Sequence, residues 1–155
     1  MKYFVVICLL AASCNIVSGQ VARPDIENLV LSAIAKYNDG NYKEAERILS
    51  AVVEKDPCSD AAYFYLAQCS LLESEPDAAE VYLRKAVELD GTNFWYRHRL
   101  ASLYAATSRP ELAIDMYEKL LEDFPKKSDI YLELVELYAA QKEVDKALAT
   151  IDEIE

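Results

Sequence analysis

Four alanines recur at one constant interval along this 155-residue chain, with no insertion between them: Ala45, Ala79, Ala113 and Ala147. Each alanine closes a similar five-residue block, and the blocks span 41–45, 75–79, 109–113 and 143–147. Pro57 and Pro125 keep the same spacing, with Gly91 at the intermediate place. A fixed period of 34 residues indicates that one supersecondary unit is repeated along the chain. Such a repeat protein is stabilised by stacking neighbouring units, because a single unit cannot bury its own apolar face.

The positions around each alanine have helical spacing. In the first half of each unit, large residues open the helix at Leu29, Tyr63 and Tyr131. The slot four residues further on is small in three of the units, at Ala33, Ala67 and Ala101, and holds the larger Val135 in the fourth. In the second half, the alanine is followed four residues later by Leu49, Leu83, Tyr117 and Ile151. Residues three, four and seven apart share one face of a helix, and the scarcity of glycine also favours helices over tight β-turns.

These residues at these spacings resemble the tetratricopeptide repeat (TPR) family, whose unit is a pair of antiparallel helices in about 34 residues. The resemblance covers about residues 26–155. It implies an all-α, right-handed superhelical solenoid of four helix-turn-helix hairpins. The expected repeats span about 26–59, 60–93, 94–127 and 128–155, and the last is incomplete.

Two departures from the repeat pattern stand out. Arg97 takes the opening slot of the third repeat, where the family has a large apolar residue. The last helix carries apolar Leu148, Ile151 and Ile154, with no polar capping helix after it. We therefore expect either that the chain is part of a longer protein or that a neighbour covers this helix, including by self-association.

The N-terminus has the pattern of a signal peptide. A basic Met1-Lys2 pair precedes an apolar run of ten residues, 3–12, which is too short to span a bilayer. We predict a signal peptide over residues 1–19 and a short linker over 20–25, with no membrane-spanning helix in the mature chain.

Two cleavage sites remain open. Residues 11–14 (AASC) resemble a bacterial lipobox, which would place a lipidated Cys14 at the mature N-terminus, although Ala11 stands where such boxes usually have Leu. Residues 17–19 (VSG) instead resemble an A-x-A-type site with cleavage before Gln20. Both forms resemble export in Gram-negative bacteria, so we expect the protein in the periplasm or lipid-anchored at the outer membrane.

The two remaining cysteines outside this segment are Cys58 and Cys69. If a helix separates them, its rise places them about 15 Å apart, whereas a disulfide needs Cα atoms within about 7 Å. We therefore predict two free, mostly buried thiols.

Charge and motifs narrow the classes of function. The net charge of −11 is opposite to what nucleic acids or anionic membranes attract. His98 is the single histidine, and neither it nor the cysteines give catalytic or zinc-ligand spacing. We predict no enzymatic activity, no cofactor and no metal, and an acidic exterior that is either solvated or suited to a basic partner.

The TPR resemblance implies a concave groove lined by the first helix of each pair. The residues it predicts to bind a partner protein or peptide are Tyr37, Phe64, Gln68, Leu71, Trp95, His98, Arg99 and Ser102. Trp95 is the expected anchor, and Arg99 with His98 gives a small basic spot. The Lys and Asn groups that clamp a peptide C-terminal carboxylate in some family members are absent, which disfavours that ligand class.

Three functional hypotheses follow. The first is a non-enzymatic scaffold of the bacterial cell envelope that binds a partner in the groove. The second is a structural role, with the groove filled by the chain's own continuation or by a second copy. The third is a TPR module of a longer enzyme or sensor.

Overall fold

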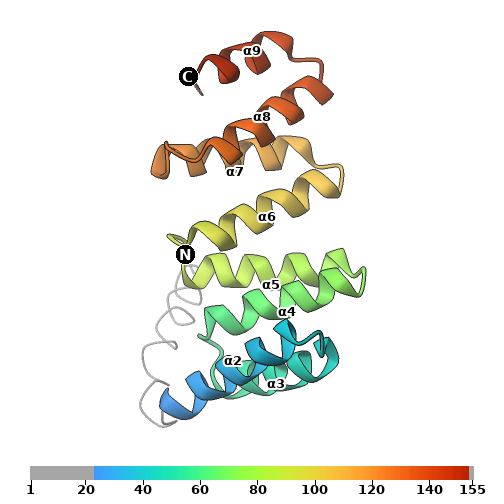
Figure 1. The fold of residues 1–155 in the computed structure, drawn as a ribbon, viewed down its shortest axis with the longest axis vertical. Helices are drawn as coiled ribbons and strands as arrows, with labels where there is room; N and C mark the ends of the chain where they lie inside the picture. The colour runs from blue at the N-terminus through green and yellow to red at the C-terminus, as the bar shows by residue number, and fades with distance from the viewer. Residues whose placement is uncertain (1–22, 154–155) are drawn as a thin grey trace, which may run out of the picture. The chain divides into compact units, whose positions relative to one another are not determined.

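The computed structural model describes residues 23–153, and side chains from residue 25 onward. The predicted signal peptide, both cleavage sites, Cys14 and Ile154 lie outside the described residues. Within them the fold is all-α, with eight helices in four helix-turn-helix hairpins, as the sequence predicts (Figure 1). The hairpins are α2 (Arg23–Asn38) with α3 (Tyr42–Lys55), α4 (Asp60–Leu72) with α5 (Pro76–Leu89), α6 (Phe94–Ala106) with α7 (Pro110–Asp123), and α8 (Ser128–Ala140) with α9 (Val144–Asp152). None of these helices is long and apolar enough to cross a membrane.

The helices form two compact units, each of two hairpins. The first unit ends at Asp90 and holds α2 to α5, and the second begins at Gly91 and holds α6 to α9. In each unit the second helix of one hairpin packs against the first helix of the next.

The core of the first unit follows the predicted helical pattern. Ala45, Leu49 and Val52 are buried along one face of α3, at the expected spacing of four and seven residues. They meet Leu66 and Ala33 from α4 and α2 in one apolar cluster. The alanines leave no side chain beyond Cβ at the contact, so the helices can approach closely. Burying each large apolar side chain contributes about 1.5–3 kcal/mol to this core.

The second unit repeats the pattern with one substitution. Ala113, Tyr117 and Leu120 are buried along α7, as their counterparts are along α3. Arg97 fills the slot that the pattern reserves for an apolar residue. Its guanidinium donates a hydrogen bond to the Lys119 carbonyl, 2.9 Å away, and forms an ion pair with Asp123 at 2.5 Å. The guanidinium is therefore paired at the end of α7, and the departure from the pattern leaves no unsatisfied charge.

The turn inside every hairpin has the same backbone form. Gly40, Ser74, Ser108 and Lys142 all have φ between 57° and 78°, and they occupy the same place in each repeat. In each case the N–H of the next residue bonds back to the carbonyl five residues earlier, for example from Asn41 to Lys36. This is the left-handed C-terminal cap that glycine adopts without strain. Three of the four turns use a residue with a Cβ instead.

Prolines sit where the sequence predicts. Pro76 and Pro110 occupy the first turn of α5 and α7, where a missing N–H costs nothing. α3 ends at Lys55 and α7 at Asp123, each two residues before a proline.

The cysteine prediction holds at one position and is wrong at the other. Cys69 is a free, buried thiol on α4, and it forms no bond with Cys58. Burial raises its pKa to about 11, so the thiol stays protonated. Cys58, however, is disulfide-bonded, and the other half of that bond lies outside the described residues. The helical separation of Cys58 and Cys69 excludes a bond between these two cysteines only, and it does not exclude a bond from Cys58 to a cysteine elsewhere.

Candidate partner-binding face

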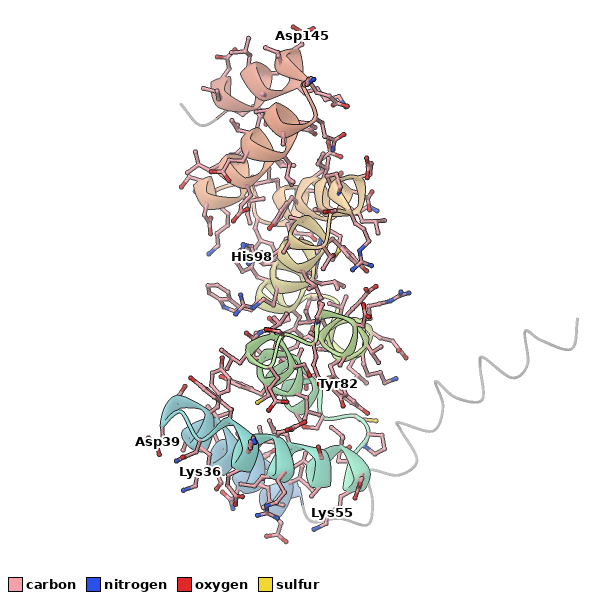
Figure 2. All side chains as sticks on the ribbon, turned by 90° about the vertical axis from the view of Figure 1, so that its right-hand side faces the viewer. Lys36, Asp39, Lys55, Tyr82, His98 and Asp145 are labelled. Atoms are coloured by element: carbon pink, nitrogen blue, oxygen red, sulfur yellow. The ribbon has the colours of Figure 1, made fainter. Side chains whose placement is uncertain are left out.

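The predicted binding residues of the second unit lie along α6. The Asn93 side chain caps the helix by accepting a hydrogen bond from the Trp95 N–H at 3.0 Å. Trp95, His98 and Ser102 follow at intervals of three and four residues, which places them on one face of α6. Figure 2 labels His98 on this helix.

Trp95 is the exposed member of a ring cluster. Its side chain is 62% exposed, and its ring meets the buried Phe94 edge-on, with centroids 5.1 Å apart. Phe124, at the end of α7, packs edge-on against the same Phe94 ring at 5.3 Å. We call Phe94, Trp95, His98 and Phe124 the α6 ring cluster. The rings beneath Trp95 fix its indole in a position that is exposed to solvent. Aromatic side chains that anchor protein interfaces are commonly presented in this way.

A lysine supplies the positive charge of this face. The Lys127 ammonium lies 4.5 Å from the Phe94 ring centroid and 5.7 Å from that of Trp95, within range of cation–π attraction. Among residues 25–153, Lys127 forms no ion pair. The helix pattern does not predict Lys127, because this residue precedes α8 and so lies outside the helix positions that line a TPR groove. The basic residues after Phe124-Pro125 are the signal that could have found it.

His98 does not provide the predicted basic charge. The imidazole stacks on Phe94, with centroids 5.5 Å apart, and also meets the Tyr117 ring at 5.8 Å. Burial lowers the pKa of His98, although Glu133 and Asp129 oppose the shift. At neutral pH His98 is therefore an uncharged ring that supports the cluster. Arg99 is exposed on the same helix.

Ser102 is engaged inside the unit. Its Oγ lies 3.0 Å from Oη of Tyr117, and either atom can donate. Burial raises the pKa of Tyr117 to about 12, so the phenol stays neutral. The Ser102 hydroxyl therefore fixes a buried tyrosine of α7, and it contributes less to a binding surface than its helix position suggests.

The predicted residues of the first unit are more enclosed. Gln68 is only 5% exposed, while Tyr37, Phe64 and Leu71 are half-buried. The Tyr37 ring meets the rings of Tyr42 and Tyr65 edge-on, at 5.3 and 5.5 Å. The Tyr37 ring therefore packs between α2, α3 and α4. The structure thus groups the eight predicted residues as four in each unit, with Trp95 the most accessible apolar one.

Metal-binding groups are a separate matter. Within residues 23–153, no group of three or more His, Cys, Asp or Glu side chains is arranged to hold a metal ion.

Known sequences place these features in a family. Two profiles described as tetratricopeptide repeat match residues 30–94 and 104–155. Human protein O-mannosyl-transferase TMTC3 is 28% identical over 97 residues, which are 61% of this chain and 11% of that protein. The chain thus spans about a tenth of this relative's length.

Solved structures show the same fold at low sequence identity. MamA superposes with a TM-score of 0.76 at 22% identity, covering 83% of this chain and 70% of MamA. YrrB, described as a TPR protein with an unusual peptide-binding site, gives 0.73 at 15% identity, covering 81% of this chain and 65% of YrrB. The first TPR of Spaghetti (RPAP3), bound to the HSP90 peptide SRMEEVD, gives 0.73 at 21% identity, with coverages of 80% and 98%. With two repeat profiles matched over most of its length and four hairpins that follow one constant repeat period, this chain belongs to the tetratricopeptide repeat family.

Proposed function

We propose that this chain is a non-enzymatic scaffold that binds a partner protein or peptide through the α6 ring cluster. The observation that carries the proposal is the exposure of Trp95, 62%, above rings that are themselves packed. Two structurally similar TPR proteins are described with peptides or a peptide-binding site, which supports the same class of function here.

The chemistry of the face defines the ligand. An apolar or aromatic side chain of the partner packs on the exposed indole, where it loses contact with water. A carboxylate next to that side chain pairs with Lys127, whose ammonium lies beside the indole and has no ion-pair partner among residues 25–153. The ligand is thus a segment that carries an apolar anchor and an acidic group.

Truncating the anchor tests this proposal. A partner is first isolated by pull-down from envelope extracts, and its affinity is measured by titration calorimetry. Trp95→Ala weakens binding by about 2 kcal/mol or more, as hot-spot aromatics do, with little change in melting temperature. Val81→Ala removes another exposed apolar side chain, from α5, and serves as the control. A Trp95→Ala variant that melts earlier and binds normally makes Trp95 a core residue and overturns the proposal.

The cellular location of the protein is part of the same proposal, and it rests on the sequence of residues 1–19. Export to the periplasm, or lipid anchoring at the outer membrane through Cys14, would place the scaffold in the envelope of a Gram-negative bacterium. N-terminal sequencing and the intact mass of the mature protein distinguish a lipidated Cys14 from cleavage before Gln20. A mature protein that retains Met1 contradicts export.

A further inference from the structure

A second surface of the second unit has its own recess. A cavity of about 500 Å³ opens between α7, α8 and α9. Its wall includes the rings of Tyr131 and Tyr138 from α8, and the carboxylates of Glu118, Glu122 and Glu153 stand around it. None of these residues belongs to the α6 ring cluster.

The charges around this cavity are not balanced. Glu118 accepts a hydrogen bond from Oη of Tyr138, and among residues 25–153 none of the three carboxylates forms an ion pair. The one cation in the lining, Lys146, is paired with Glu143 at 2.6 Å. Three carboxylates therefore face a single ammonium that is already engaged.

Lys146 already places a positive charge against one ring of the cavity wall. The Lys146 ammonium lies 5.3 Å from the centroid of the Tyr138 ring, the distance of a cation–π contact. Tyr138 keeps its proton, because burial and the bond to Glu118 both raise its pKa. The ring is thus a neutral face with a carboxylate at its hydroxyl.

The first unit has a different residue at the key position. Thr150 of the cavity corresponds to Tyr82, two repeats earlier, and Tyr131 corresponds to Tyr63. The Tyr82 ring, labelled in Figure 2, packs 6.3 Å from the Tyr63 ring and against the core of the first unit. Thr150 is smaller, and its hydroxyl donates to the Lys146 carbonyl of its own helix at 2.9 Å. The second unit therefore lacks the side chain that covers the equivalent tyrosine in the first.

We infer that this cavity binds an arginine or lysine side chain of a basic partner peptide. The aliphatic stem of such a residue fits along the apolar part of the wall, and its cationic head reaches the ring faces and carboxylates. The volume suits a side chain with its neighbouring backbone. A second copy of this chain is the poorer occupant, because two molecules of net charge −11 repel each other.

The test uses the full chain and two synthetic peptides, acetyl-GRLRG-amide and acetyl-GELEG-amide, in titration calorimetry at low salt. The wild-type protein binds the arginine peptide and not the glutamate peptide. Thr150→Tyr, which places the side chain of the first unit in the cavity, weakens binding of the arginine peptide at least tenfold. Thr150→Ser keeps the cavity open and leaves the affinity unchanged. Circular dichroism checks that each variant is folded.

A second pair of variants does not depend on filling the cavity. Glu122→Gln with Glu153→Gln removes two exposed carboxylates and weakens binding several-fold, with a shallower dependence on salt. Glu54→Gln makes the same change at the counterpart of Glu122 in the first unit, and it has no effect. Trp95→Ala also leaves the arginine peptide bound, which separates this inference from the function proposed for the α6 ring cluster.

Three results overturn the inference. One is a wild-type chain that binds neither peptide, and another is equal binding by the wild type, Thr150→Tyr and the double glutamine variant. The third is a concentration-dependent dimer in sedimentation that Thr150→Tyr abolishes, which would make a second copy the occupant.

Discussion

The two units share one repeat pattern, but equivalent helices of the two units are buried to different extents. In the first unit α4 contacts α2, α3 and α5 and buries every residue from Leu66 to Ser70. In the second unit α8, its counterpart, buries only Ile130, Leu134 and Tyr138. The same helical sequence pattern therefore gives an enclosed helix in one unit and a partly open one in the other. The repeat sets the scaffold, and the residues that differ between copies decide which faces remain available to a partner.

Matched leucines give the largest expected effect. Leu66 is 1% exposed within the first core, and Leu134, its counterpart two repeats later, is 3% exposed beside the open cavity. Leu66→Ala should cost about 3–4 kcal/mol, because the packed surroundings leave an empty space. Leu134→Ala should cost about 2 kcal/mol, because water can enter beside it. Denaturant unfolding with hydrogen exchange measures both, and equal costs would contradict the contrast between the units.

The arginine in the second unit's apolar slot gives the next effect. Arg97→Ala removes the bond to the Lys119 carbonyl and the ion pair with Asp123. Because Asp123 is largely exposed, we expect a loss of about 1–2 kcal/mol in unfolding free energy. Arg84→Ala in the first unit breaks a longer pair with Glu80, 3.6 Å between the charged atoms, in which the arginine is largely exposed, and it should cost less than about 0.5 kcal/mol. Thermal melts of the two variants compare them, and similar losses would mean that Arg97 acts only as a surface charge.

The turns offer a smaller test. Gly40→Ala should destabilise the first unit by about 1 kcal/mol, because a Cβ is strained at positive φ. No atom lies within 4 Å of the added Cβ, so the strain is confined to the backbone. Lys142→Gly in the second unit should stabilise by a similar or smaller amount. Chemical denaturation reports both changes; a neutral Lys142→Gly would show that this turn relaxes without glycine.

The smallest effect is a dependence on pH confined to the second unit, which contains the only histidine. The pKa of His98 is lowered on folding, so the unfolded chain binds the proton more tightly. The contribution of His98 to the free energy of unfolding is fully present above the ordinary pKa of histidine. This contribution falls as the pH drops from the ordinary pKa toward the lowered pKa of the folded state. His98→Phe should flatten the difference in stability between pH 7.5 and pH 5.5. An unchanged pH profile in this variant would assign the effect to other groups.

Part of the candidate site could be predicted from the sequence, and part could not. The helix phase placed Trp95, His98 and Ser102 on one face, as local periodicity allows. The same phase could not tell that Ser102 is bonded to Tyr117, or that Lys127 lies over Phe94. It also treated Gln68 and Trp95 alike, although one is buried and the other exposed. These differences arise from contacts with other helices, which a single helix pattern does not contain.

The sequence by itself determined the repeat period, the four hairpins, the buried alanines and the proline positions. These depend on spacing along the chain and on the conformational limits of single residues. Only the tertiary structure decided the exposure of Trp95, the lowered pKa of His98, the partners of Arg97 and the open cavity beside Thr150. Each of these depends on side chains from another helix, about 15 to 30 residues away, and burial and charge act through space rather than along the chain.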